Sequence, residues 1–342
     1  MGIPKKRKKN RKRKTLTIIF FLLTVLLLVT AILTLQYTAK RKEQLTSRVS
    51  DGKTASMKND DAITYKGTRY IYNDHLSNFL FMGIDRREKA ETEVGQADAG
   101  QADAVFMISW DRVEHKLTLI SIPRDTMTEI EVFGPTGRSF GKSTDHLSLA
   151  YAFGDGGTKS CELMKEAVSN LLCGIPIQGY CAINMDAIPL LTDAVGGVTV
   201  VVPDDSLEEK YPEFQEGAEV VLDGENTEIF VRHRDTSESQ SALARQKRQN
   251  VFLKAYAAKV TDLISQDSSF TTELYTKLNP YMVTNIGNDI FIKMGEDAAS
   301  GGTGETFTLP GEGVEGKSFD EYHVDEDALK EMVMEVFYKE VT

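Results

Sequence analysis

One stretch constrains the chain before any other. The twenty residues from Leu16 to Leu35 contain no charged side chain, and their only polar members are threonines. A helix rises about 1.5 Å per residue, so twenty residues span roughly 30 Å, the thickness of the hydrocarbon core of a bilayer. We therefore predict a transmembrane helix over residues 16–36.

A basic cluster precedes this apolar segment. Nine of the ten residues Lys5–Lys14 are lysine or arginine, and such clusters stay on the cytoplasmic side of a membrane. We expect residues 1–15 to be a cytoplasmic tail, and the chain from about Tyr37 onward to lie outside a cell membrane that it crosses once. A cleaved signal peptide is the alternative, but its apolar core would be shorter and would end in an A-x-A-like site, for which Ala39 is a poor match.

Charge is divided unevenly along the chain. The 342 residues carry a net charge of −11, and outside the basic tail 31 basic residues face 51 acidic ones. The outer part is therefore strongly acidic, which argues against broad binding of nucleic acid. Within it, the segment Val231–Gln249 holds five arginines and lysines together with His233. This local positive charge indicates an anionic ligand outside the cell.

The middle of the chain alternates between strand and helix patterns. Residues 37–75 are polar, and we expect a stalk or linker there. Residues 76–265 then show apolar runs typical of strands and helical periodicity, in this order: strands at Ser77–Asp85, Ala104–Asp111 and Lys116–Asp125, a helix at Cys161–Cys173 and a long helix from Ser241 to Ser265. This alternation indicates an α/β layered domain.

The remaining residues, 266–342, show no chemical motif. We expect them to pack on the domain as a C-terminal extension. The glycine-rich segment Gly295–Gly316 predicts a loop, and Asp325–Val341 has the pattern of a terminal amphipathic helix.

Three cysteines occur, and their spacing matches no metal site. Cys161 and Cys173 would lie about 18 Å apart along a helix, which is too far for a disulfide. The odd number suggests buried thiols, with pairing of Cys173 and Cys181 left open.

Charged residues gather where the predicted strands end. Asp85 and Arg87 follow one strand, Asp103 directly precedes the next, and Arg124 and Asp125 end the third. Each could singly be a turn residue or part of a structural ion pair. Ligands bind at strand ends in α/β sheets, however. Paired carboxylates can hold Mg²⁺ against phosphate oxygens, and arginines grip phosphate bidentately, so together these residues predict a metal-assisted pyrophosphate site.

In this order, the motifs resemble those of the LytR-CpsA-Psr family of cell-wall glycopolymer ligases. The matching stretches are FLFMGIDRR, KLTLISIPRDT, LSLAYAFGDGG, GIPIQGYCAINMDAIPLLTDAVGGVTVVVP, LDGENTEIFVRHRD and ARQKRQ. The resemblance implies a mixed-sheet α/β/α sandwich with a hydrophobic groove for a polyprenyl chain. It also implies transfer of a glycopolymer from an undecaprenyl-pyrophosphate-linked lipid to a peptidoglycan hydroxyl, forming a phosphodiester, with Mg²⁺ as cofactor.

The resemblance further implies roles for single residues. Asp85 and Asp103 would be the acids beside Mg²⁺. The residues expected to act in catalysis are Arg124, Asp125, Arg232 and Arg234. Those expected to bind the pyrophosphate are Arg87, Arg245, Arg248 and Gln249. Asp103 or Asp125 could orient or deprotonate the acceptor hydroxyl, and the sequence does not choose between them.

The sequence departs from the family pattern in two places. Gln101-Ala102-Asp103-Ala104 stands where the family commonly has Arg-Ser-Asp-Thr, and the repeated GQADA offers Asp98 as an alternative acid. We favour Asp103 because it directly abuts the predicted strand. A Lys-x-Asn pair of many members is also missing near Ser148, and Lys142 or His146 could replace it.

Two other functions fit the same residues. A hydrolase would use water as the acceptor at the same site. A membrane-anchored protein that only binds prenyl phosphates, as a regulator, would need the arginines but would have less use for Asp85 and Asp103. The pair of acids therefore favours an enzyme.

Overall fold

The structure, a computed structural model, describes residues 62–87, 92–235, 238, 240–301 and 303–341. The predicted cytoplasmic tail, the predicted transmembrane helix over 16–36 and most of the predicted stalk lie outside the described residues. Within the described ranges, no helix combines the length and the apolarity that crossing a bilayer requires.

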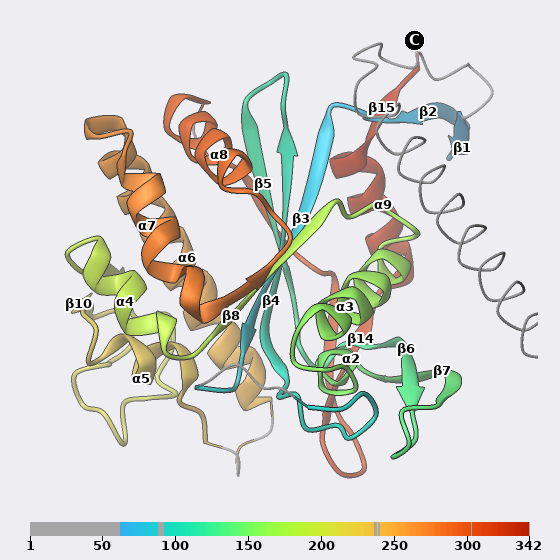
Figure 1. Cartoon of the computed structure of the whole chain (residues 1–342), viewed down its shortest axis with the longest axis horizontal. Coiled ribbons are helices and arrows are strands. Elements are labelled where there is room, and N and C mark those ends of the chain that lie inside the picture. Colours follow the sequence, from blue (N-terminus) through green and yellow to red (C-terminus); the bar gives the residue numbers. More distant parts are fainter. Residues whose placement is uncertain (1–61, 88–91, 236–237, 239, 302, 342) are drawn as a thin grey trace, which may run out of the picture. The chain divides into compact units, whose positions relative to one another are not determined.

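A mixed six-stranded sheet lies at the centre of the domain (Figure 1). Its strand order is β11-β8-β3-β4-β5-β12. The pairs β3–β8 and β5–β12 are parallel, and the other neighbours are antiparallel. The strands are β3 (Leu76–Ile84), β4 (Ala102–Asp111), β5 (Lys116–Ile122), β8 (Gly179–Asn184), β11 (Met282–Thr284) and β12 (Thr303–Thr308).

Helices cover both faces of this sheet, so the domain has three layers (Figure 1). On one face lie α2 (Leu149–Ala152), α3 (Thr158–Leu171) and α9 (Glu326–Phe337). On the other lie α4 (Ala187–Ala194), α5 (Thr227–Arg232), α6 (Ser241–Gln266), α7 (Phe270–Leu278) and α8 (Asn288–Gly301). The expected mixed-sheet α/β/α architecture is the observed one.

The central strand β3 shows why the sheet needs two helical layers. Its sequence LSNFLFMGI is nearly continuously apolar, as is typical of a strand buried on both faces. Leu80 and Met82 join the core beneath α3 and α9, whereas Phe79 packs with Met282 and Met294 on the opposite face. Alternate residues of one strand thus anchor both layers.

Small sheets surround the central one. One has three strands, β1 (Ile63–Tyr65), β2 (Thr68–Tyr72) and β15 (Tyr338–Glu340). The others have two strands each: β6 (Met127–Phe133) with β7 (Ser139–His146), β9 (Val198–Val201) with β10 (Glu219–Leu222), and β13 (Gly311–Glu315) with β14 (Asp320–Val324). A 3₁₀ turn, η2 (Asn279–Tyr281), precedes β11.

The folded domain begins earlier than we expected, and its last part is integral to the sheet. β1 and β2 fall within the predicted stalk 37–75, yet β2 pairs with β15 from the other end of the chain. From the predicted extension 266–342 come β11 and β12, the two edge strands of the central sheet. Backbone pairing of short, mostly polar strands leaves little periodic signal in a sequence, so the boundaries near 75 and 265 were misplaced.

The predicted glycine-rich loop Gly295–Gly316 was also wrong. Its first residues complete α8, and most of the others form β12 and β13. Thr306 and Thr308 align with Leu119 and Ser121 of β5. Pairing with a neighbouring strand overrides the weak strand propensity of glycine-rich sequence here.

All three cysteines are free. Cys161 and Cys181 are buried, as expected, but Cys173 is exposed, so the expectation of a buried thiol was wrong at that position. Burial raises the pKa of the Cys181 thiol to about 12, which keeps it protonated and unreactive.

Candidate functional site

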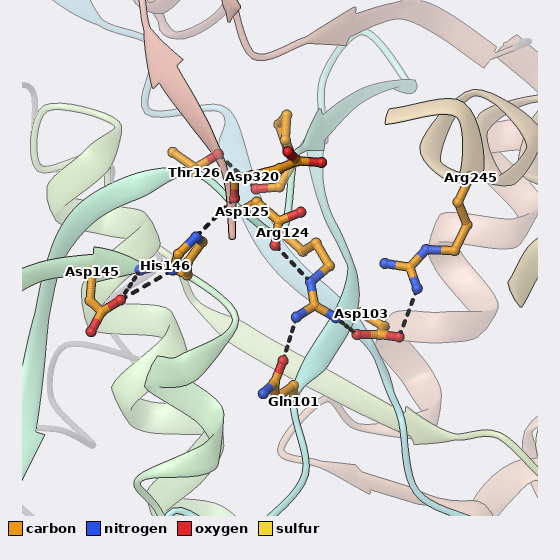
Figure 2. A network of polar contacts seen from close by, with 10 residues as sticks. Gln101, Asp103, Arg124, Asp125, Thr126, Asp145, His146, Arg245 and Asp320 are labelled. Atoms are coloured by element: carbon orange, nitrogen blue, oxygen red, sulfur yellow. Dashed lines mark hydrogen bonds and ion pairs between the residues drawn. The ribbon is translucent and has the colours of Figure 1, made fainter. Parts of the chain in front are cut away.

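The register of two strands brings an acid and an arginine together. Val105 of β4 pairs with Ile122 of β5 in an antiparallel ladder, so two residues further along Asp103 faces Arg124. Arg124 Nη1 donates to Asp103 Oδ1. The other oxygen, Oδ2, accepts from Arg245 Nη1 of α6 at 3.1 Å. Asp103 therefore lies between two guanidinium groups that come from different layers of the fold (Figure 2).

Arg124 is held on three sides. Besides Asp103, its Nε donates to Asp125 Oδ1 at 3.0 Å, and its Nη2 donates to Gln101 Oε1. The sequence identifies Gln101 only as a departure from the family's arginine and does not predict its contact with Arg124. The glutamine fixes the guanidinium without adding charge, and the orientation of Arg124 is determined before any ligand binds.

Arg245 differs from Arg124 because it is only partly satisfied. Its side chain is 6% exposed, and neither Nε nor Nη2 has a hydrogen-bond partner among the described residues. Burial lowers the pKa of the Arg245 guanidinium. The negative charge of Asp103 raises this pKa, and the positive charges of Arg124 and Arg234 lower it further. A buried donor without a partner costs about 1–3 kcal/mol, more if charged. An anion with two acceptor oxygens would remove that cost.

The other two residues of the predicted R-x-x-R-Q motif donate to backbone carbonyls, although Gln249 also lines a hollow together with Asp103 and Arg245. Arg248 is buried, donates from Nε to Phe230 O at 2.8 Å and from Nη2 to His233 O, and also contacts Ser206. Gln249 Nε2 donates to Val231 O at 3.1 Å. In this geometry Arg248 does not reach the site of Asp103. Both side chains extend from α6 and hold the backbone of the segment Phe230–His233, which includes Arg232.

Arg232 and Arg234 lie where α5 ends. Arg232 is the last residue of the helix, and Arg234 follows it in the chain beyond the helix end. Glu228, one turn earlier, pairs with Arg232 and also accepts from Arg87 Nη2 at 2.8 Å. Arg87 also pairs with Asp186 at 3.3 Å, and its side chain is 61% exposed. It thus lies at the periphery of the arginine group.

The two candidate metal-side acids have different surroundings. Asp85 Oδ1 accepts from the backbone N–H of Gln101 at 2.6 Å, just beyond the end of β3. The alternative acid, Asp98, pairs with Arg86 and is largely exposed. No group of three or more His, Cys, Asp or Glu side chains suited to a metal occurs within the described part of the chain. Mg²⁺ commonly takes one or two carboxylates together with substrate phosphates. Asp85 fits such a site, and Asp103 fits it by sharing an oxygen that already accepts from an arginine.

Two hollows meet at these residues. One is an apolar cavity of about 250 Å³ between the sheet and α4 and α6; the other is a polar cleft of about 860 Å³. The apolar side chains that line the cavity include Phe81, Phe106, Ile108, Leu119, Ile183, Ile188, Leu191 and Phe252. Both hollows are lined by Asp85, Asp103, Arg232 and Arg245. The charged group therefore separates an apolar compartment from a polar one.

The polar cleft also contains the position where a family Lys-x-Asn pair is missing. Lys142 pairs with Glu166 at 2.9 Å and does not line the cleft. His146 does line it, with Nδ1 3.2 Å from Asp145 Oδ1 and Nε2 3.0 Å from Asp320 O (Figure 2). Ser148 lines it as well, and its buried Oγ has no partner within the described residues. Of the two suggested replacements, only His146 therefore lines the polar cleft, together with Ser148.

Comparisons with known proteins agree with this architecture. The sequence model of the LytR_cpsA_psr family matches residues 32–337. A polyisoprenyl-teichoic acid–peptidoglycan teichoic acid transferase TagU from Halalkalibacterium halodurans is 30% identical over 195 residues, which are 57% of this chain and 54% of the relative. The chain thus spans about half the length of that relative. TagU from Enterococcus faecalis is 28% identical over 267 residues, 78% of this chain and 80% of the relative.

A solved structure described as TagT bound to LI-WTA has the same fold. Its TM-score against this chain is 0.57 at 22% sequence identity, and the superposition covers 76% of this chain and 89% of that one. At this level of identity the likeness concerns the fold alone.

The different surroundings of Arg245 and Arg248 predict unequal effects of their substitution on stability. Arg248→Met removes donors from two buried carbonyls, so we expect the free energy of unfolding to fall by about 3 kcal/mol. Arg245→Met removes a buried charge with unpaired N–H groups while Asp103 keeps Arg124, so we expect a change of less than about 1 kcal/mol. Urea denaturation followed by circular dichroism measures both. Equal losses in the two variants would contradict these assignments.

Proposed function

Because the chain belongs to the LytR-CpsA-Psr family, with a match over residues 32–337, we propose that it transfers a glycopolymer from a polyprenyl-pyrophosphate lipid to a peptidoglycan hydroxyl. The observation that carries this proposal is the half-satisfied guanidinium of Arg245 at the junction of an apolar cavity and a polar cleft. A ligand with an apolar tail, an anionic middle and a sugar head matches these three environments in order. The relatives named as teichoic acid transferases support the same reaction class.

In this proposal the prenyl chain enters the cavity beside α6, and the pyrophosphate lies against the arginines. Arg245 donates from Nε and Nη2, while Arg124, Arg232 and Arg234, which also line the polar cleft, add positive charge from other sides. Fixed donors that face developing charge stabilise a transition state without reorganising. Arg87 contributes indirectly, because it shares Glu228 with Arg232.

The acceptor hydroxyl would approach from the polar cleft. Its oxygen forms a bond to the phosphorus next to the sugar, and the bond from that phosphorus to the bridging oxygen breaks, so lipid monophosphate leaves. We assign Asp125 as the carboxylate that takes the hydroxyl proton. Asp125 lines the cleft and uses one oxygen for Arg124, whereas both oxygens of Asp103 are occupied by arginines. A positioned general base of this kind contributes about 10²–10⁴-fold.

We further propose that Mg²⁺ acts at this site. Asp85 would hold it as the main ligand, and Asp103 would join through an oxygen that it shares with an arginine; when bound, the ion would neutralise charge on the phosphate oxygens. Asp85 has the more accessible carboxylate of the two. Arg248 and Gln249 are positioning residues in this proposal, because they hold the segment that carries Arg232 and Arg234.

A reconstituted reaction tests the proposed function. The full chain is incubated with Mg²⁺, a synthetic polyprenyl-pyrophosphate-linked disaccharide and peptidoglycan oligomers, and products are identified by mass spectrometry. A new phosphodiester between disaccharide and oligomer supports the transferase. Release of sugar phosphate without coupling would instead support a hydrolase. Lipid binding without any turnover would support a non-enzymatic regulator and contradict the proposal.

A matched pair of variants locates the activity. Arg245→Met should lower kcat/KM for transfer at least about 100-fold, because it removes the donors that face the phosphate. Lys247 lies two residues away on the same helix and is exposed, so Lys247→Met is the control and should retain parental activity. Equal activity of both variants would show that the phosphate binds elsewhere.

We also propose that the chain is anchored in the cell membrane by residues 16–36, with the catalytic domain outside. The charge-free run Leu16–Leu35 and the basic cluster before it support this orientation. An N-terminal epitope tag should therefore resist protease added to intact cells, while the domain is digested. Digestion of the tag from outside would overturn the orientation.

A further inference from the structure

The β13–β14 hairpin contributes a wall to the polar cleft that the function described above does not explain. Residues 315–320 at its tip line the same cleft as Arg124, Arg234 and Arg245. The hairpin belongs to the C-terminal part of the chain, in which the sequence shows no chemical motif. Its position nevertheless places it next to the proposed path of the sugars.

At this tip the structure displays an aromatic ring to solvent. Phe319 is 75% exposed although it lines the cleft. An isolated exposed phenylalanine needs no special explanation. This one lies beside a charged site, however, where most of the surrounding side chains are polar, and a ring left in water there has apolar surface available for a ligand.

The backbone that carries Phe319 is held in place from three directions. Asp320 Oδ2 accepts from Gln240 N at 2.5 Å, and Asp320 O lies 3.0 Å from His146 Nε2. Tyr322 N, two residues further along β14, donates to Asp125 O at 2.9 Å, which ties this strand to the segment that carries Arg124 and Asp125. A Cβ at Gly316 would lie 2.2 Å from the Phe319 carbonyl oxygen, so this tight turn requires glycine.

The ring itself has a defined orientation. Phe319 and His146 meet at an interplanar angle of 87° with centroids 6.4 Å apart, so the contact is edge-to-face. Such a contact leaves at least one face of the Phe319 ring open. The face of an aromatic ring is electron-rich and attracts partially positive hydrogens, and one face of a pyranose ring presents a row of C–H groups of this kind.

We propose that Phe319 is a sugar-binding platform that stacks on a pyranose ring in the polar cleft and thereby sets glycan specificity. The inference rests on the proposed function for the location of the sugars. The ring could belong to the donor glycan next to its pyrophosphate or to the acceptor glycan, since both would pass through this cleft. Asp125 and His146 would then lie on the same side of the site as the bound sugar.

The experiment uses Phe319→Ala, with Phe140→Ala as a matched control. Phe140 is 73% exposed on the neighbouring β6–β7 hairpin but does not line the cleft. With the full chain, we expect Phe319→Ala to raise one KM about two- to tenfold, as for loss of an aromatic stacking contact. A rise in the KM of the lipid-linked disaccharide identifies the donor ring, and a rise in the KM of the peptidoglycan oligomer identifies the acceptor ring. Phe319→Trp should keep the parental value.

Binding without turnover separates this inference from the proposed function. Saturation-transfer NMR is recorded with two soluble probes, the free disaccharide of the donor and a peptidoglycan tetrasaccharide. Signals from C–H protons in the parental chain and Phe140→Ala, and their loss in Phe319→Ala, would support the platform even if transfer were absent. Unchanged KM values and signals in Phe319→Ala, or no saccharide signal with the parental chain, would overturn it.

Discussion

The site depends on one shared carboxylate. Asp103 accepts from Arg124 with one oxygen and from Arg245 with the other, so it holds two guanidinium groups close together inside the domain. Without it, two like charges near each other and mostly buried would repel. With it, each nitrogen of the Arg124 guanidinium has a partner, whereas Arg245 keeps Nε and Nη2 unpaired. The fold thus keeps a buried guanidinium with two unpaired nitrogens, which is unfavourable in free energy. An anionic ligand that accepted hydrogen bonds from these nitrogens would remove this penalty.

Both the central sheet and the helical layer that covers it contribute residues to this interaction. The β4–β5 register sets Asp103 opposite Arg124, and α6 delivers Arg245 from the covering layer. On the same helix, Arg248 and Gln249 donate to three backbone carbonyls at the end of α5 and just after it, those of Phe230, Val231 and His233. These bonds position Arg232. Three residues of one short motif therefore have two kinds of surroundings: Arg245 contacts Asp103 and keeps two nitrogens unpaired, whereas Arg248 and Gln249 hold the end of α5. The apolar cavity and the polar cleft then meet where the charges lie.

The sequence alone was enough to predict those candidate site residues that lie at the ends of strongly apolar strands. Asp85, Asp103 and Arg124 were identifiable because β3, β4 and β5 have clear patterns and strand ends meet at one edge. The separate surroundings of Arg245 and Arg248 were not predictable, since helical spacing gives direction but not the depth of burial. Gln101 and Phe319 were missed because a neutral side chain and a hairpin tip carry no motif. The edge strands β11 and β12 were missed because their pairing partners are far away in sequence.

The central claim is that a pyrophosphate binds between the apolar cavity and the polar cleft through the unpaired nitrogens of Arg245. A crystal structure of the chain with a bound polyprenyl-pyrophosphate-linked disaccharide tests this most directly. The account predicts phosphate oxygens within hydrogen-bonding distance of Arg245 Nε and Nη2, with the prenyl chain against Phe81 and Phe106 and the sugar in the cleft. A pyrophosphate bound away from Arg245, or a prenyl chain outside the cavity, would contradict it.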